Sequence, residues 1–230
     1  MRLYYCLLLF CLPISFSWAQ DSLSVAIDDR YREDQFYASI TYNLLSNNPN
    51  GVSQSDFSTG FHFGFIRDMP INQKRNWSIG IGLGISSNSY NQNLIITETS
   101  GNINFSIDDG GLGNITKNKF TTYLIDVPFE FRWRTSSAET YKFWRIYPGF
   151  KLSYLVYNSS KLKSDLLTTN VSNIDAFNKL QYGLTLSAGY GTWNFQIYYG
   201  LNSIFDDTAQ LNNQSIDSRA IKVGIMFYIL

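Results

Sequence analysis

Cysteine is almost absent from this chain. Of its 230 residues only Cys6 and Cys11 are cysteines, and both lie in the apolar segment at the N-terminus. We expect residues 1–19 to be a cleavable signal peptide, because Arg2 precedes the apolar run and small residues ending at Ala19 follow it. A membrane helix is the alternative, but the run is short for one. Without this segment the chain has no thiol, which excludes disulfides, cysteine-ligated zinc and a cysteine nucleophile.

An excess of charge of either sign is also missing. Eighteen basic and 18 acidic residues give a net charge of +0 and a pI of about 6.6, so no basic field exists to bind nucleic acid. The single histidine, His62, has no Ser and Asp partners at a meaningful spacing. Residues 108–111 (Asp-Asp-Gly-Gly) lack the alternating oxygen ligands of a calcium loop, so we interpret them as a turn. We therefore predict a non-enzymatic protein with no cofactor, no metal and no small-molecule substrate.

Long apolar runs are absent beyond the N-terminal segment, although 17% of the residues are aromatic. The apolar residues instead occupy every second position, as in β-strands with one apolar face. In the clearest case, Trp77, Ile79, Ile81, Leu83 and Ile85 alternate with glycine and serine. Eight segments show this pattern: 36–44, 57–67, 77–86, 123–134, 144–156, 180–190, 193–201 and 221–229.

The connections between these segments favour a membrane barrel over the alternative, a soluble β-sandwich. Long polar segments alternate with short links, as the extracellular loops and periplasmic turns of outer-membrane barrels do. The long segments are 46–55, 87–119, 158–178 and 206–218, and the short links are 67–76, 135–142 and 191–192. We predict an all-β protein, a closed antiparallel transmembrane β-barrel of about eight strands over residues 35–230, preceded by a short periplasmic N-terminal arm, residues 20–34.

Tryptophan placement supports a membrane. Each of four tryptophans stands at the turn-proximal end of a predicted strand, in the outward register, and indoles collect at membrane interfaces. They form a predicted periplasmic aromatic girdle: Trp77, Trp133, Trp144 and Trp193. The outward residues from Tyr123 to Trp133 span about 10 residues of strand, which would cover roughly 25 Å of hydrocarbon at a 45° tilt. We expect a location in the outer membrane, in contact with its lipid, with the N-terminus periplasmic and the long loops extracellular.

The inward faces of three predicted strands carry charge, which an eight-stranded barrel has to pack. We predict a lumen charge network made of Asp126, Glu130, Arg132, Arg134, Arg145, Lys151 and Lys222. If the turn 135–142 pairs residues symmetrically, Asp126 lies opposite Lys151, and Arg132 lies opposite Arg145 with Glu130 nearby. We interpret the network as a structural filling, because buried charges need partners; a ligand or ion site is the alternative.

Two prolines in the same pair of strands predict an irregularity. Pro128 and Pro148 lie nearly opposite each other, and proline cannot donate to a sheet ladder. We therefore expect a β-bulge there, which could turn the side chain of Asp126 or Glu130 to the other face.

The mixed-charge segment ahead of the first strand allows two interpretations. It is either a solvated arm or a partner-docking arm, and it comprises Asp28, Asp29, Arg30, Tyr31, Arg32, Glu33 and Asp34.

The segment Tyr123-Leu-Ile-Asp-Val-Pro-Phe-Glu-Phe-Arg132 resembles the Tyr-Leu-acidic-aliphatic-Pro pattern of PorT-type barrels of Bacteroidetes. Asp29 to Tyr37 and Ile221 to Leu230 resemble the PorT (SprT) family itself. This resemblance implies an outer-membrane component of the type IX secretion machinery, which exports cargo proteins and serves gliding motility, with other type IX secretion proteins as partners. There are two alternatives. The first is a general surface barrel or adhesin that acts through its loops, and the second, less favoured, is a lipid-modifying enzyme.

Overall fold

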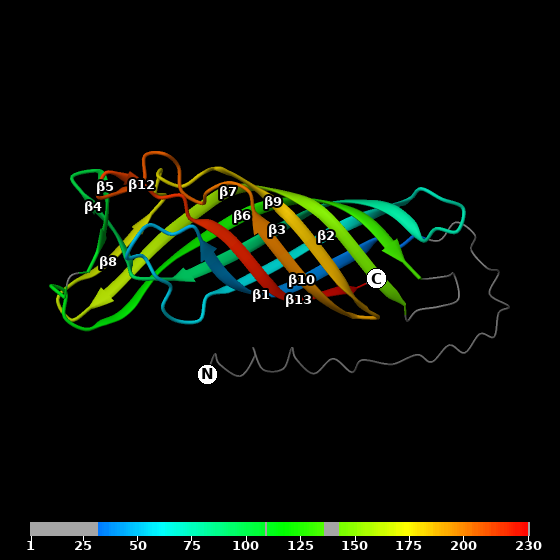
Figure 1. The fold of residues 1–230 in the computed structure, drawn as a ribbon, viewed down its shortest axis with the longest axis horizontal. Coiled ribbons are helices and arrows are strands. Elements are labelled where there is room, and N and C mark those ends of the chain that lie inside the picture. Colours follow the sequence, from blue (N-terminus) through cyan, green and yellow to red (C-terminus); the bar gives the residue numbers. More distant parts are fainter. Residues whose placement is uncertain (1–31, 109, 136–142, 230) are drawn as a thin grey trace, which may run out of the picture.

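The computed structural model describes residues 32–108, 110–135 and 143–229, and every regular element in them is a β-strand. The predicted signal peptide and residues 20–31 of the predicted arm lie outside the described residues. Eight strands form the barrel wall, whose arrangement is drawn in Figure 1. They are β1 (Gln35–Ser46), β2 (Thr59–Pro70), β3 (Trp77–Asn91), β6 (Ile115–Arg134), β7 (Trp144–Ser164), β9 (Leu180–Tyr190), β10 (Trp193–Gly200) and β13 (Arg219–Ile229).

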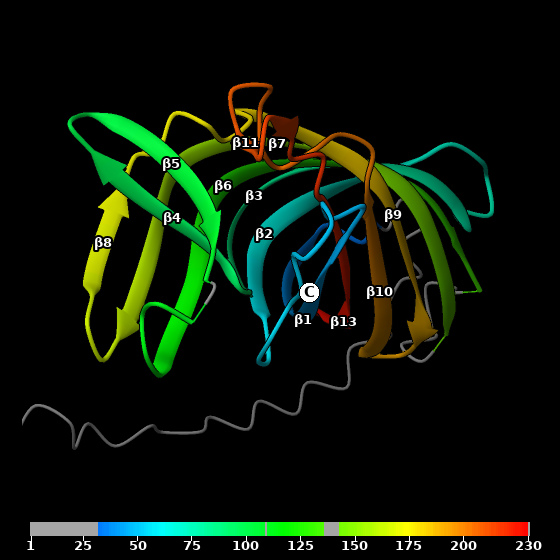
Figure 2. The same cartoon turned by 60° about the vertical axis from the view of Figure 1, so that its left-hand side comes forward.

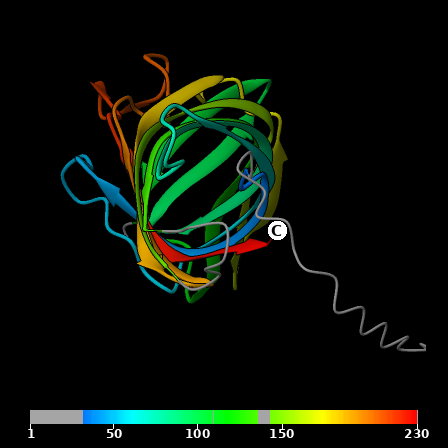
Figure 3. The same cartoon turned by 90° about the vertical axis from the view of Figure 1, so that its right-hand side faces the viewer.

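The wall is a closed antiparallel barrel, as the sequence predicts. The strand order is β6-β3-β2-β1-β13-β10-β9-β7, and β6 pairs with β7 to complete the ring. The first and last strands pair along their length, from Phe36 opposite Ile229 to Ser46 opposite Arg219. Seen along the barrel in Figure 3, the strands surround one interior. Closure leaves no free edge in the part of the wall that faces lipid.

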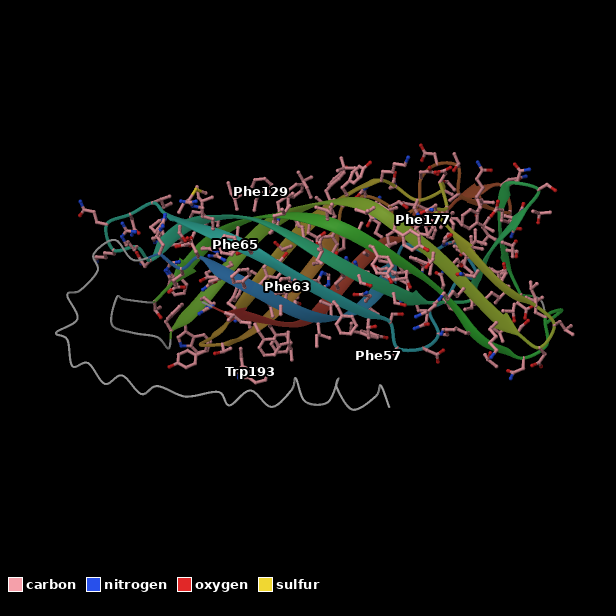
Figure 4. All side chains as sticks on the ribbon, turned by 180° about the vertical axis from the view of Figure 1, so that it is seen from behind. Phe57, Phe63, Phe65, Phe129, Phe177 and Trp193 are labelled. Atoms are coloured by element: carbon pink, nitrogen blue, oxygen red, sulfur yellow. The ribbon has the colours of Figure 1, made fainter. Side chains whose placement is uncertain are left out.

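Side chains alternate between lipid and interior along every wall strand. In β1, Phe36 and Ile40 are about half exposed, whereas Ser39 and Asn43 are buried. Large apolar side chains cover the outside of the wall (Figure 4). Because apolar exposure on this scale is unusual for a soluble monomer, the outer surface fits a hydrocarbon environment.

The two ends of the barrel differ. The end with short connections, here called the turn end, has the links 71–76 and 135–143 and the tight turn at Gly191-Thr192, where Gly191 has a φ of +57°. The other end, here called the loop end, carries two small hairpins and a short strand (Figure 2). The hairpins are β4 (Leu94–Thr99) with β5 (Asn102–Ile107) and β11 (Gln210–Leu211) with β12 (Gln214–Ser215); the strand is β8 (Thr168–Ser172), which pairs with β7.

Two segments that we predicted as polar loops are largely strands. The prediction for 87–119 was wrong because β3 continues to Asn91 and β6 begins at Ile115, and the prediction for 158–178 was wrong because β7 continues to Ser164. Outward residues in these extensions are polar, such as Lys119 and Lys161. The apolar alternation ends where the contact with lipid ends, whereas the strands continue to pair beyond it. A prediction from hydropathy alone therefore ends these strands too early.

The predicted pairing across the 135–142 turn was wrong by two residues. Asp126 lies opposite Ser153, and Arg145 lies opposite Arg134 rather than Arg132. The cause is that the Thr135 N–H donates to the Trp144 backbone oxygen at 2.9 Å, so that the turn is centred one residue later in the chain than we assumed. A shift of two residues keeps every side chain on its predicted face, since the period of a strand is two.

The predicted bulge at the prolines was also wrong. The β6–β7 register shifts instead between Tyr123 and Leu124 and near Ile115. Pro128 lies in a gap of the β3–β6 ladder, between the Ile81–Phe129 and Gly84–Asp126 pairs, which share one register. Because the ladder has no pair at Pro128, the absent proline N–H leaves no hydrogen bond unmade, and no bulge is needed. Both Asp126 and Glu130 therefore remain inward and buried.

Candidate functional site

The structure places all seven predicted network residues on inward faces of β6, β7 and β13, at most 7% exposed. They do not form one network. Four lie near the turn end and three lie further along the barrel: Glu130, Arg132, Arg134 and Arg145 in the first group, and Asp126, Lys151 and Lys222 in the second. Each group includes further residues that the sequence prediction missed.

Asp68 is the centre of the turn-end cluster. Its Oδ1 lies 3.1 Å from Arg132 Nη1, and its Oδ2 lies 2.8 Å from Arg134 Nη2. Ser78 Oγ also donates to Asp68 Oδ1, at 2.6 Å. Sequence reasoning missed Asp68 because it ended the second strand at Arg67. Extending the alternation of Phe61, Phe63 and Phe65 by one position would have placed Asp68 inward.

Two glutamates complete the turn-end cluster. Arg132 Nε donates to Glu130 Oε2 at 2.9 Å, and Arg134 Nη1 lies 3.9 Å from Glu33 Oε2. Burial raises the pKa of Glu33, against the opposing effect of Arg134 and Arg145. Two arginines, Arg132 and Arg134, thus contact three carboxylates in a region with little access to water.

Part of the predicted arm enters the mouth of the barrel. Glu33 is 3% exposed, and its backbone oxygen accepts from Arg132 Nη1 at 3.3 Å. Asp34 Oδ1 accepts from the Asp68 backbone N–H at 2.8 Å, whereas Arg32 is exposed. The other four predicted arm residues, Asp28, Asp29, Arg30 and Tyr31, lie outside the described residues. The end of the arm is therefore bonded to the turn-end cluster.

Arg145 contacts aromatic rings rather than carboxylates. Its guanidinium lies 4.5 Å from the Phe143 ring centre and 5.3 Å from that of Tyr228. The Tyr147 ring lies near two arginines, 4.8 Å from Arg132 and 6.0 Å from Arg145. Attraction between a cation and a ring face stabilises such contacts, and the ring keeps the two like charges apart.

The second group, the mid-barrel cluster, is built on Asp126. Lys151 Nζ lies 3.3 Å from Asp126 Oδ2 although the two are not directly opposite, and Ser153 Oγ donates to Oδ1 at 2.6 Å. His62 Nδ1 lies 3.9 Å from the same carboxylate. Lys151 and Lys222 lie 5.0 and 4.8 Å from the Tyr198 ring centre. The predicted ion pair of Asp126 with Lys151 therefore exists as a diagonal contact.

Glycines on β2 and β3 make room for large side chains that enter the interior from other strands. A Cβ on Gly80 would lie 2.8 Å from Arg132 Nε, and one on Gly64 would lie 2.7 Å from Tyr37 Cε1. The space left between the two clusters is a cavity of about 10 Å³ lined by His62, Glu130 and Lys151, among others. This is room for about one water molecule.

A hydrophobic core, which the sequence prediction missed, fills the loop end. Phe120, Phe177 and Phe205 pack with ring centres 4.7 to 5.5 Å apart, and Phe105 lies 5.8 Å from Phe205. Leu94, Ile96, Ile174, Ile204 and Ile216 surround them. Most of these residues come from segments that we predicted as polar, whereas Phe120, Ile204 and Phe205 lie just outside those segments. Short apolar groups such as Leu94-Ile95-Ile96 and Ile204-Phe205 were the available signal.

The four predicted girdle tryptophans all lie at the turn end and face outward or partly outward. Trp77, Trp144 and Trp193 begin β3, β7 and β10, and Trp133 is the next-to-last residue of β6. Trp193 is 65% exposed and is visible near the turn end in Figure 4. Trp77 and Trp133 are paired in register with ring centres 6.3 Å apart.

Other kinds of site find little support in the described part of the chain. It contains no cluster of three or more His, Cys, Asp or Glu side chains placed to hold a metal ion. Asp108 Oδ1 accepts from the Leu112 backbone N–H at 3.3 Å, as in a turn, and Asp109 lies outside the described residues. The described residues also contain no helix that is long and apolar enough to cross a membrane.

Fold and interior together define a small barrel with apolar side chains outside and a packed interior. The chain belongs to the family described as "Outer membrane protein beta-barrel domain", whose model matches residues 18–206. It is therefore an outer-membrane β-barrel protein.

Among solved structures, Ail, the attachment invasion locus protein of Yersinia pestis, is 13% identical with a TM-score of 0.40. That alignment covers 86% of this chain and 99% of the other. Ail in complex with the heparin analogue sucrose octasulfate is also 13% identical over the same shares, with a TM-score of 0.36. No curated protein matches the chain.

Proposed function

We propose that this barrel is a non-enzymatic outer-membrane component of the type IX protein secretion machinery, needed for export of cargo proteins and, in gliding species, for motility. The observation that carries the proposal is the packed interior. Charged side chains fill the turn end around Asp68, and the aromatic core fills the loop end. A barrel without an open path acts through contacts of its surface rather than by conducting cargo.

The resemblance to PorT-type barrels supports the choice of machinery. The Tyr123–Arg132 segment lies in β6, where it supplies Asp126 to the mid-barrel cluster and Glu130 and Arg132 to the turn-end cluster. In the proposed orientation the turn end and the arm face the periplasm, the loop end faces outward, and other type IX secretion proteins bind the arm, the loops or the wall.

The first test is deletion of the gene in the native bacterium, with comparison of secreted proteins between the deletion strain and the complemented strain. Cargo that accumulates in the periplasm supports the proposal. An unchanged set of secreted proteins contradicts it.

An adhesin is a second candidate, favoured by the ordered β4–β5 hairpin. The hairpin exposes Glu98, Asn102 and Asn104 at the loop end while its apolar side packs on the core. A triple alanine variant at these positions should restore secretion in the deletion strain under the secretion proposal. Under the adhesin alternative, this variant should fail to restore attachment, and secretion should not depend on the gene.

A lipid-modifying enzyme is the least supported alternative. His62 is 4% exposed and lies inside the wall, with Nε2 3.1 Å from Thr41 Oγ1. A base in this position has no contact with lipid. His62→Gln should leave secretion and lipid composition unchanged, and altered lipid in this variant would favour the enzyme.

A further inference from the structure

Four lysines face outward from the extensions of β6 and β7 beyond the lipid-facing band. They form two directly opposed pairs, Lys117 with Lys163 and Lys119 with Lys161. We call these four residues the lysine ladder. Their strands turn Phe120 and Leu162 into the interior, which fixes the lysines on the outer face. Because like charges in direct cross-strand positions destabilise a sheet, the arrangement lowers the stability of the barrel.

The neighbouring strands supply no compensating charge in the same rows. Asn91 of β3 lies beside Lys119, and Asn170 and Thr168 of β8 lie beside Lys161 and Lys163. Among the described residues, no ion pair joins a ladder lysine to a carboxylate. The ladder is thus a concentrated positive patch with no anionic partner in the described part of the chain.

The ladder begins just beyond the lipid-facing band, close enough for long lysine side chains to reach lipid headgroups. Tyr123 and Tyr157, paired in register with ring centres 5.7 Å apart, end the outward band that begins at Trp133. Lys119 lies four residues beyond Tyr123, which is about 9 Å of height for a strand tilted by 45°. Lys117 lies about 14 Å beyond Tyr123 on the same estimate. Flexible lysine side chains can also bend toward the membrane surface.

We propose that the lysine ladder binds the phosphate groups of anionic lipid in the leaflet at the loop end. A lipid beside β6 and β7 lays its chains against the apolar wall and the Tyr123–Tyr157 pair, and its phosphate then reaches the ladder. A soluble polyanion would gain only the charge contacts, so the continuity of the ladder with the lipid-facing wall favours lipid.

The test is titration of the purified, folded protein in neutral detergent with phosphatidic acid or phosphatidylcholine, with bound lipid counted by native mass spectrometry. The variants Lys117→Gln/Lys163→Gln and Lys119→Gln/Lys161→Gln each remove one pair. The matched control, Lys74→Gln/Lys179→Gln, removes two exposed lysines outside the ladder. Because the ladder variants relieve repulsion, we expect them to fold, which a heat-shift gel verifies.

The native protein should prefer phosphatidic acid, and each ladder variant should bind it roughly 30-fold more weakly. Binding of phosphatidylcholine, and all binding by the control, should not change. Equal binding of the two lipids by the native protein, or equal losses in the ladder and control variants, would overturn the proposal. Ladder-dependent binding of dextran sulfate in the absence of any phosphatidic acid preference would also overturn it, in favour of a soluble polyanion.

Discussion

Replacing Asp68 tests the turn-end cluster most sharply, because this one carboxylate contacts two buried guanidiniums. Asp68 is 0% exposed and accepts from Arg132, Arg134 and Ser78. Asp68→Asn keeps the shape of the side chain but leaves both arginines without their shared anion. Breaking a buried ion pair from one side costs about 3–5 kcal/mol. Glu130 still faces Arg132, so we expect the lower part of this range.

The assay is unfolding of the barrel in urea after reconstitution into lipid vesicles, followed by tryptophan fluorescence. Trp77, Trp133 and Trp144 lie near the cluster at the turn end and report its loss. The matched control is Asp56→Asn, which neutralises an exposed aspartate at the loop end. A free energy of unfolding for Asp68→Asn equal to that of the control would refute the assignment of Asp68 as the centre of the cluster.

Three further predictions concern other residues of the interior. Asp126→Lys and Lys151→Asp should each destabilise the barrel, and the reciprocal swap should restore part of the loss; a double-mutant cycle without coupling would contradict the diagonal ion pair. Phe205→Ala should cost about 3–5 kcal/mol in urea unfolding, since the ring is 1% exposed, and a loss under about 1 kcal/mol would argue against a packed loop end. Because burial raises the pKa of Glu33, the native stability relative to Glu33→Gln should fall as pH rises from the ordinary carboxyl pKa through the raised value; a pH-independent difference would contradict this burial.

The lipid-facing half of the fold could be predicted from the sequence because hydrocarbon imposes a simple rule. Every second residue in a spanning strand must be apolar, so the outward faces of residues such as Phe63, Ile81 and Phe195 follow directly from alternation. All eight wall strands were located in this way. This rule does not apply to residues beyond the membrane, which explains why β6 was predicted to begin at Tyr123 rather than at Ile115.

The interior could be predicted only in part. Alternation placed Asp126, Glu130 and Arg132 inward, but which charges meet depends on where the turn is centred and on contacts between diagonal neighbours. Lys151 contacts Asp126 although the predicted register was wrong. Asp68 was missed because the second strand was predicted to end one residue earlier, at Arg67.

The loop-end core could not be predicted from strand periodicity. Phe177 and Phe205 come from irregular segments, and an isolated bridge pairs them across about 30 residues of chain. Such contacts depend on how loops fold over the barrel mouth, which a period of two does not describe. Short apolar groups inside polar segments are the sequence feature to examine in similar barrels.

The central claim, that both ends of the interior are packed and the barrel acts through its surface, is tested most directly by electrical recording. The purified protein would be inserted into a planar lipid bilayer and its current measured under applied voltage. The packed charged cluster and aromatic core predict no conducting steps from the native protein. Regular, reproducible conducting steps would show an open path through the interior and contradict the account.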